Sequence, residues 1–165
     1  MNNKDFLEKL KELLACNDAV AWVGTKDFKT AWNKCVRANW MLWLICKMEI
    51  GTREERIHII CDCAATSLKY VPKGEDRPQL AIEAARTYAD FPTPENLEKL
   101  RAARDAAWAA AWAAAGDAAW AAAGDAARDA ARDAAGAAAR DAAGDAAHKK
   151  MCKMIRNKIS IGEIK

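Results

Sequence analysis

An alanine-rich segment with a four-residue period, residues 102–148, constrains the fold of this 165-residue chain more than any other feature. From Trp108 onward, one position in every four departs from alanine, and the position after it is often aspartate. The departing positions are Trp108, Trp112, Gly116, Trp120, Gly124, Arg128, Arg132, Gly136, Arg140, Gly144 and His148. Because alanine has the highest helix propensity of all residues, the segment is predicted to be helical.

The period also predicts how these positions are distributed around the helix. A step of four residues turns by about 40° more than one full turn, so the departing positions wind slowly around the axis. The tryptophan part, residues 108–120, and the arginine part, residues 128–140, are therefore predicted to lie on opposite faces, with the change around Gly116 and Gly124. We expect the first part to pack on an N-terminal core and the second to face solvent or a partner.

Shorter helices are predicted for the rest of the chain. Apolar residues recur there with the helical period, and no segment shows the alternation that is typical of a strand. Thr52 and Glu55 form a capping-box pattern, and Thr25 and Asp76 are placed to cap the helices that follow them. The sequence therefore predicts an all-α protein.

The predicted organisation is a compact bundle of short helices over residues 1–92, with a long alanine-rich helix within residues 93–165 packed on it in one structural domain. Thr93 followed by Pro94 is typical of the start of that helix. A straight helix over residues 95–159 would be about 100 Å long, too long for a domain of this size to cover. We therefore expect the helix to break near a glycine, to protrude or to dimerise.

Composition excludes several classes of function. Hydrophobic residues make up 52% and charged residues 30% of the chain, which is typical of a globular protein. The net charge of +3 is too small to indicate a nucleic-acid-binding protein. No uncharged stretch approaches the roughly 18 residues of a membrane span, and the first residues do not form a signal peptide. We expect a cytoplasmic protein that does not bind membranes.

The residues offer little for catalysis or metal binding. None of the nucleophile-elbow, zinc-protease, P-loop or dinucleotide-binding motifs occurs. The six cysteines form no C-x-x-C pair, so we expect buried reduced thiols. The pairs His58–Cys61 and His148–Cys152 have helical spacing and would hold zinc only if their helices met. The sequence therefore predicts a protein that is not an enzyme and uses no cofactor or metal.

A cluster of tryptophans lies within residues 22–43. Its members are Trp22, Trp32, Trp40 and Trp43. Such a cluster is typical of a packed core, but aromatic walls near arginines also suit a cleft for stacked bases and anionic groups. The arginines expected to serve such a cleft are Arg37, Arg77 and Arg86. The sequence leaves both interpretations open.

Residues 32–44, with the sequence WNKCVRANWMLWL, resemble the signature A-W-x-x-C-x-R-x-D-W-M-L-W-L of a family of immunity proteins (immunity-five-like) from bacterial polymorphic toxin systems, which phages also carry. Residues 61–65, 77–78 and 81–86 are similar to the second half of the same pattern, and the alanine-rich tail also looks like that family. The chain departs from the pattern at Asn39, where aspartate is common, and at Ala65, where arginine is common. The resemblance implies a non-catalytic binding protein.

Three functions follow as hypotheses. The first is an immunity or inhibitor-type protein that neutralises a toxin or a defence component by binding it. The second is a phage anti-defence protein that sequesters a nucleotide immune signal in a pocket lined by tryptophan and arginine. The third is a structural module that forms homo-oligomers through the alanine-rich helix. The residues expected to bind the partner or ligand are Arg37, Trp40, Trp43, Asp62, Arg77 and Arg86.

Overall fold

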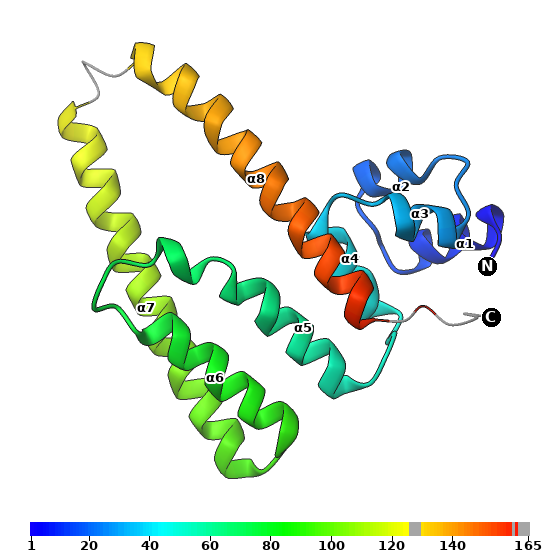
Figure 1. Ribbon diagram of the computed structural model, residues 1–165, viewed down its shortest axis with the longest axis horizontal. Coiled ribbons are helices and arrows are strands. Elements are labelled where there is room, and N and C mark those ends of the chain that lie inside the picture. The colour runs from blue at the N-terminus through cyan, green and yellow to red at the C-terminus, as the bar shows by residue number, and fades with distance from the viewer. Residues whose placement is uncertain (126–129, 160, 162–165) are drawn as a thin grey trace. The chain divides into compact units, whose positions relative to one another are not determined.

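The computed structural model describes the backbone of residues 1–125, 130–159 and 161, and the side chains of residues 1–110, 144–159 and 161. Every regular element in this part of the chain is a helix, so the all-α prediction is confirmed (Figure 1). In chain order the elements are α1 (Asn3–Glu12), α2 (Asn17–Val23), α3 (Phe28–Lys34), α4 (Ala38–Lys47), α5 (Arg53–Ala65), the short 3₁₀ helix η1 (Leu68–Tyr70), α6 (Arg77–Asp90), α7 (Pro94–Asp125) and α8 (Ala130–Lys158). None of the described helices is both long enough and apolar enough to cross a membrane.

The chain forms two compact units. Unit 1 consists of Met1–Ile59 together with Asp145–Lys165, and unit 2 consists of Ile60–Gly144. The bounds of these units differ from the predicted segments 1–92 and 93–165, because residues 60–92 belong to unit 2 and residues 145–165 belong to unit 1. The predicted packing of one segment on the other as a single domain stays a prediction.

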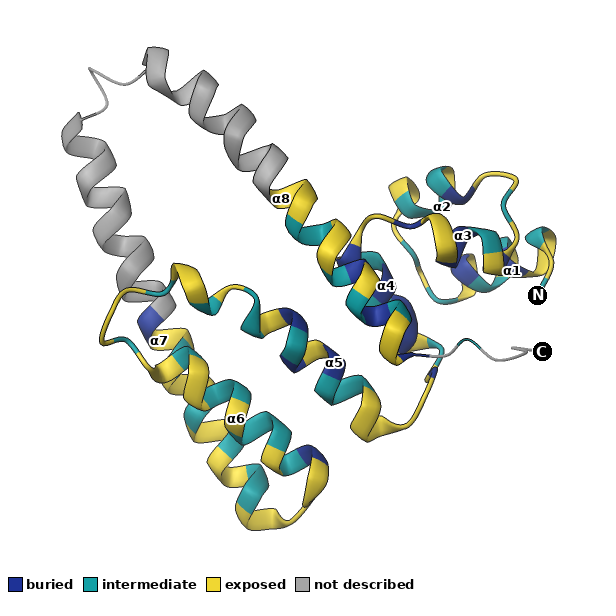
Figure 2. Ribbon diagram, in the orientation of Figure 1, coloured by how far each residue is buried: buried dark blue, intermediate teal, exposed yellow. Residues whose placement is uncertain are grey.

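The core of unit 1 combines side chains from both of its chain segments (Figure 2). Phe6 of α1 packs edge-on against Phe28 of α3, with ring centroids 5.2 Å apart. From α8, Cys152 and Ile155 are 1% and 0% exposed. The largest side chains that are almost fully buried in unit 1 are Met41, Ile45, Ile59, Ile155 and Ile159.

Two side chains of α8 satisfy backbone groups at the junction between α3 and α4. The Arg156 guanidinium donates from Nε to the carbonyl of Trp32 at 3.0 Å, and from Nη2 to the carbonyl of Cys35. The backbone N–H of Ala38, in the first turn of α4, donates to Nδ1 of His148 at 3.2 Å. Carbonyls at a helix end and N–H groups at a helix start lack partners within their own helix, so α8 caps both ends of this junction.

Unit 2 contains a helical hairpin of α6 and α7, joined by a short turn. Thr93 caps α7 as predicted, because its hydroxyl accepts a hydrogen bond from the backbone N–H of Asn96 at 3.2 Å. Within the same unit, the Arg86 guanidinium of α6 bonds the carboxylate of Asp62 on α5 at 2.8 Å. Asp76 precedes α6, but its side chain makes no capping bond.

The prediction that the tryptophan part of the repeat is packed is wrong at Trp108, which is 66% exposed. The positions of α7 that are partly or fully buried, among its described side chains, are Asn96, Leu97, Leu100, Ala103, Ala107 and Ala110. They follow the 3.6-residue period, so they form one stripe, and Trp108 lies off it. Within the repeat, the small alanines, which allow close approach of a neighbouring helix, therefore lie on the packed face and Trp108 does not. Trp112, Trp120 and the arginine part lie outside the described side chains.

Two further predictions concern helix ends. Thr25 was expected to cap the following helix, but Asp27 is the cap of α3, because its carboxylate accepts from the backbone N–H of Thr30 at 2.7 Å. A break of the long helix was expected near a glycine, but the backbone is helical at Gly116, Gly124, Gly136 and Gly144, and residues 126–129 lie outside the described residues.

Candidate functional site

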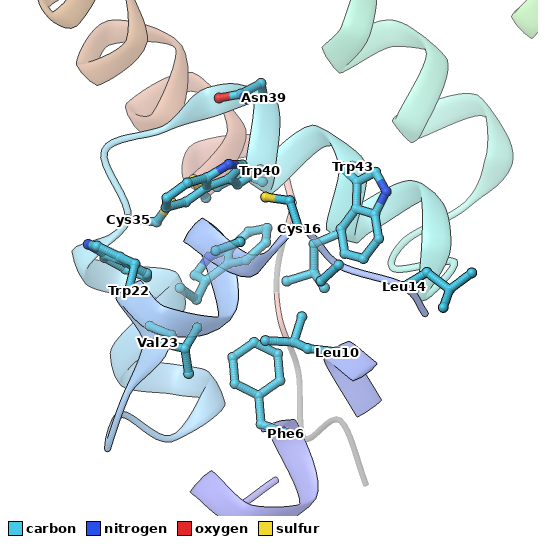
Figure 3. Close-up of a pocket in the computed structure, with 16 residues that line it drawn as sticks. Phe6, Leu10, Leu14, Cys16, Trp22, Val23, Cys35, Asn39, Trp40 and Trp43 are labelled. Atoms are coloured by element: carbon cyan, nitrogen blue, oxygen red, sulfur yellow. The ribbon is translucent and has the colours of Figure 1, made fainter. Parts of the chain in front are cut away.

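A cavity of about 340 Å³ lies in unit 1, among α1, α2, α3 and α4 (Figure 3). All four tryptophans of the cluster line it: Trp22, Trp32, Trp40 and Trp43. No charged side chain is among the residues of its lining, so its walls are aromatic and aliphatic. Exposed residues such as Leu14 and Asn39 also line it, so the cavity is open to solvent.

The tryptophans differ in how far they are buried. Trp32 on α3 is 4% exposed and forms a closed wall, whereas Trp22, Trp40 and Trp43 are only half-buried. The rings of Trp22 and Trp40 lie 5.9 Å apart at an angle of 55°. The helix α4 is apolar on nearly all sides, and Trp40, Met41 and Trp43 all line the cavity, Met41 from a fully buried position. The tryptophan cluster therefore contributes both to the core and to the wall of the cavity.

Leu14 lines one end of the cavity in an unusual backbone conformation. The helix α1 ends in a Schellman motif, in which the backbone N–H of Ala15 donates to the carbonyl of Leu10 at 2.9 Å and that of Leu14 to the carbonyl of Lys11 at 3.0 Å. This motif places Leu14 in the left-handed region at φ 59°, where glycine is usual. The Leu14 side chain is 87% exposed and points away from Phe6 and Leu10 (Figure 3).

Three of the predicted site residues lie at this cavity. Trp40 and Trp43 line it, and the Arg37 guanidinium lies over the ring of Trp40, 5.3 Å from its centroid. Arg37 precedes the first residue of α4, where its carbonyl accepts from the backbone N–H of Trp40 at 3.1 Å. The side chain of Arg37 is exposed and does not line the cavity.

The other three predicted residues belong to unit 2 and are engaged there. Asp62 and Arg86 form the 2.8 Å ion pair between α5 and α6, with 20% and 39% of their side chains exposed. Arg77 bonds Glu75, with its Nε 2.7 Å from Oε1, and this hydrogen bond lowers the pKa of the Glu75 carboxyl. No arginine is among the residues that line the cavity, and the predicted cleft in which Arg37, Arg77 and Arg86 accompany the tryptophans stays a prediction.

The cavity wall also contains a thiol, which the sequence did not indicate. Cys35 is 5% exposed, lines the cavity and interacts with the thiol of Cys152. A hydrogen bond from Cys152 is the largest cause of a lowered pKa of Cys35, which is about 7 against an ordinary 9.0. The charges of Arg156 and Arg37 also lower this pKa, whereas burial opposes the shift. No local pattern relates two cysteines that lie so far apart in the chain, so only the folded structure reveals the pair.

The remaining cysteines are partly as predicted. Cys61 and Cys63 are buried, and burial raises the pKa of both, that of Cys63 to about 11. Cys16 and Cys46 are exposed, which corrects the prediction of buried thiols at these two positions. All six cysteines are free thiols.

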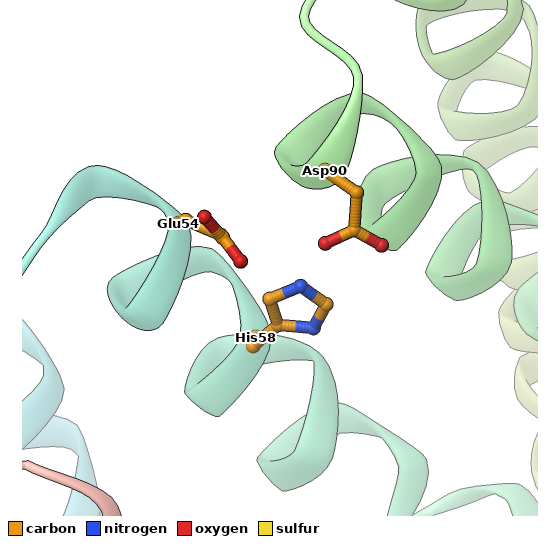
Figure 4. Close-up of side chains that lie close together, drawn as sticks. All are labelled: Glu54, His58 and Asp90. Atoms are coloured by element: carbon orange, nitrogen blue, oxygen red, sulfur yellow. The ribbon is translucent and has the colours of Figure 1, made fainter.

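Figure 4 shows Glu54 and His58 one turn apart on α5, and Asp90 at the end of α6. Glu54 and His58 belong to unit 1, whereas Asp90 belongs to unit 2. Two side chains on one exposed helix face are too few to build a metal site of protein ligands. The zinc arrangement considered from the sequence is not formed at His148 and Cys152, because Nδ1 of His148 accepts from Ala38 and Cys152 pairs with Cys35.

The candidate site is therefore an apolar, tryptophan-walled cavity in unit 1, with Leu14 at one end and a thiol of lowered pKa in its wall. Its volume is at the lower end of the roughly 300–1,000 Å³ that is typical of ligand pockets. It suits an apolar group much better than an anionic one, because no lining side chain would neutralise a charge. No protein-family model, no curated protein and no solved structure matches the chain.

Proposed function

We propose that this protein is a non-catalytic binding protein that neutralises a partner protein by binding it, and that the cavity of unit 1 receives an apolar side chain of that partner. The observation that carries the proposal is the cavity itself, which is open, apolar and walled by half-buried tryptophans. Apolar side chains that fill desolvated pockets provide most of the binding energy in many protein interfaces. The partial exposure of Trp22, Trp40 and Trp43 leaves apolar surface that such a side chain would cover.

The resemblance to immunity proteins supports the same proposal. Seven of the sixteen residues that line the cavity come from residues 32–44, the segment that resembles the immunity-protein signature. The segment on which the resemblance rests is therefore the segment that forms much of the cavity. The resemblance to that family and the form of the cavity therefore both support a role in binding a partner.

The charge of unit 1 favours an acidic partner. Unit 1 contains 16 lysine or arginine residues and 10 aspartate or glutamate residues, whereas unit 2 contains 10 and 13. Near the cavity, Arg37 is exposed beside Trp40, and Lys34 is exposed at the end of α3. Opposite charges steer association and select among partners, so the expected partner presents an apolar side chain within an acidic surface.

Leu14 is a further sign of binding. An exposed leucine in a left-handed conformation is unfavourable both for its backbone and for its side chain in water. Strained residues of this kind tend to occur at sites of function. A partner that packs against Leu14 at the end of the cavity would remove its side chain from water.

The other two hypotheses receive less support. Sequestration of a nucleotide immune signal needs cationic side chains in the pocket, and the lining of this cavity has none. Oligomerisation through the alanine-rich helix concerns side chains within residues 111–143, which lie outside the described side chains. We therefore retain both only as outcomes of the experiment below.

The proposal is tested by selecting peptides from a random display library on the full-length protein, and titrating the selected synthetic peptides by calorimetry. We expect acidic peptides with a central leucine, phenylalanine or tryptophan, and at least a tenfold weaker affinity for Trp43→Ala. Trp108→Ala is the matched control, because it removes an exposed tryptophan of unit 2 and should leave the affinity unchanged. Equal affinities for wild type and Trp43→Ala would refute the proposal. Heat with cyclic nucleotides or ADP-ribose, and none with peptides, would favour nucleotide sequestration instead.

A further inference from the structure

The guanidinium of Arg37 lies at the edge of the tryptophan-walled cavity. It is placed over the ring of Trp40, 5.3 Å from its centroid, and Trp40 itself lines the cavity. In the part of the chain that the structure describes, no carboxylate or carbonyl accepts a hydrogen bond from this guanidinium. A guanidinium that lies over an aromatic ring keeps the N–H donors at its edge available. Arg37 can therefore bind an acceptor that a partner provides.

The backbone of Arg37 is held in place at the start of α4. Its carbonyl accepts from the backbone N–H of Trp40 at 3.1 Å, from that of Met41 at 3.3 Å, and from the thiol of Cys35 at 3.5 Å. Binding costs less when the groups that bind are already ordered, because less conformational freedom is lost. The side chain of Arg37, which is exposed, therefore extends from a fixed point beside the cavity.

The surroundings of Arg37 are cationic. Residues 28–48, which include α3 and α4, contain no acidic residue, and neither do residues 146–156 of α8. The cations of these two segments are Lys29, Lys34, Arg37, Lys47, Lys149, Lys150, Lys153 and Arg156. The segments are in contact, because His148 and Arg156 bond backbone groups at the junction between α3 and α4. The positive potential here favours an anionic group of a partner.

We propose that Arg37 binds the carboxylate side chain of an aspartate or glutamate of the partner, next to the apolar side chain that fills the cavity, and thereby selects the partner. This inference rests on the proposed function. Trp40 connects the two contacts, because its ring lines the cavity and lies under the guanidinium. Arginine pairs with a carboxylate through two parallel hydrogen bonds, a geometry that a neutral amide does not match.

The arrangement also limits the sequence of the partner. A single ring, that of Trp40, contacts the guanidinium and lines the cavity, so the carboxylate and the apolar side chain of the partner must lie close together. On a helix, side chains three or four residues apart are such neighbours. We therefore expect the acidic residue of the partner to lie within about four residues of its apolar side chain.

The test is a double-mutant cycle between the full-length protein and one of the selected peptides, chosen because it binds Trp43→Ala more weakly than wild type. The acidic residue nearest the apolar side chain of the peptide is replaced by glutamine, and calorimetry measures both peptides with wild type and with Arg37→Gln. We expect the glutamine peptide to bind wild type about tenfold more weakly than the acidic peptide, and Arg37→Gln to bind both equally. Lys29→Gln is the matched control, because it removes an exposed cation of α3 outside the cavity lining, and it should preserve the tenfold difference.

Two further variants separate charge from folding. Arg37→Glu should prefer a peptide in which lysine replaces the acidic residue. Asn39→Asp adds a carboxylate of almost the same size beside Trp40 at the start of α4 (Figure 3), so it should weaken binding of the acidic peptide and leave that of the glutamine peptide unchanged. An acidic residue in the first turn of a helix is favourable, so the free energy of unfolding of Asn39→Asp should not fall.

The outcomes distinguish this inference from the proposed function. If no selected peptide binds Trp43→Ala more weakly than wild type, the proposed function fails, and this inference fails with it. If Trp43→Ala weakens binding but the two peptides differ by the same factor with wild type and with Arg37→Gln, the proposed function stands and the assignment of Arg37 is overturned.

Discussion

Leu14 and Glu49 are the two residues other than glycine with a positive φ in the described part of the chain. Each follows the C-cap of a helix, Leu14 after α1 and Glu49 after α4. In both motifs the next residue donates its backbone N–H to a carbonyl five residues earlier. Glycine is the common signal of such a helix end. Because neither position is a glycine, these two helix ends are difficult to predict from the sequence.

We predict that Leu14→Gly raises the free energy of unfolding by about 1 kcal/mol, because glycine adopts the left-handed conformation without the steric penalty of a side chain. The same change should weaken binding of the selected peptides, since it removes the exposed leucine at the end of the cavity. Urea unfolding and calorimetry measure the two effects separately. The matched control is Glu49→Gly, which should stabilise the protein similarly and leave peptide affinity unchanged.

The lowered pKa of Cys35 predicts a pH dependence of stability. The pKa is about 7 in the folded protein against an ordinary 9.0, so the folded state favours the thiolate. The resulting contribution to stability is complete above pH 9 and is lost as the pH falls from 9 to 7. Urea unfolding of wild type and Cys35→Ser under reducing conditions should show a stability difference that grows from pH 7 to 9. Parallel curves for the two proteins would contradict this prediction.

At the scale of elements, the clearest agreement between sequence and structure is the start of α5. The Thr52 backbone N–H donates to Oε2 of Glu55 at 2.8 Å, and the Glu55 backbone N–H donates to Oγ1 of Thr52 at 3.1 Å. This is the capping box predicted from the two residue types and their spacing. Such local motifs are predictable because the groups involved lie within one turn of each other.

We predict that Thr52→Ala lowers the free energy of unfolding by about 1 kcal/mol, because it leaves a backbone N–H of the first turn without its side-chain partner. Chemical denaturation monitored by circular dichroism provides the measurement. Thr25→Ala is the control, because Asp27 and not Thr25 caps α3, and we expect it to have little effect. An equal loss in both variants would show that the capping box is not the cause.

The junction between α3 and α4 shows what local patterns miss. Arg156 and His148 reach this junction from α8, across more than a hundred residues of sequence. The partners of Arg156 are carbonyls at the end of α3, which attract a cation because the C-terminal end of a helix carries partial negative charge.

At the scale of the whole molecule, unit 1 is assembled from both ends of the described chain. Ile155 and Ile159, from the C-terminal segment, are 0% and 2% exposed. A buried side chain stabilises the folded state in proportion to the apolar surface that it removes from water. We therefore expect these two residues to contribute to the stability of unit 1 as the buried residues of its N-terminal segment do. Its folding therefore requires contacts of long sequence separation.

We predict that Ile155→Ala lowers the free energy of unfolding by about 2–5 kcal/mol, because it leaves a cavity in a packed core. Amide hydrogen exchange of α1 to α4, followed by mass spectrometry, should show faster exchange in this variant. The control is Lys153→Ala on the same helix, where the side chain is exposed and little change is expected. Unchanged protection of α1 to α4 in Ile155→Ala would contradict the shared core.

The sequence by itself determined the features that depend on near neighbours in the chain. These include the all-α fold, the capping box at Thr52, the cap at Thr93 and the density of tryptophans in residues 22–43. Helix propensity, capping and periodicity act over one or two turns, so a single sequence is enough to see them.

Only the tertiary structure decided which of these features meet. It assigned the four tryptophans of residues 22–43 to one cavity, and it left Trp108 exposed while Ala103, Ala107 and Ala110 lie on the packed face of the same helix. It also placed Asp62 and Arg86 in a pair within unit 2, and Trp40 and Trp43 at the cavity of unit 1. The physical reason is that burial depends on all the residues around a side chain, and most of those lie far away in the sequence.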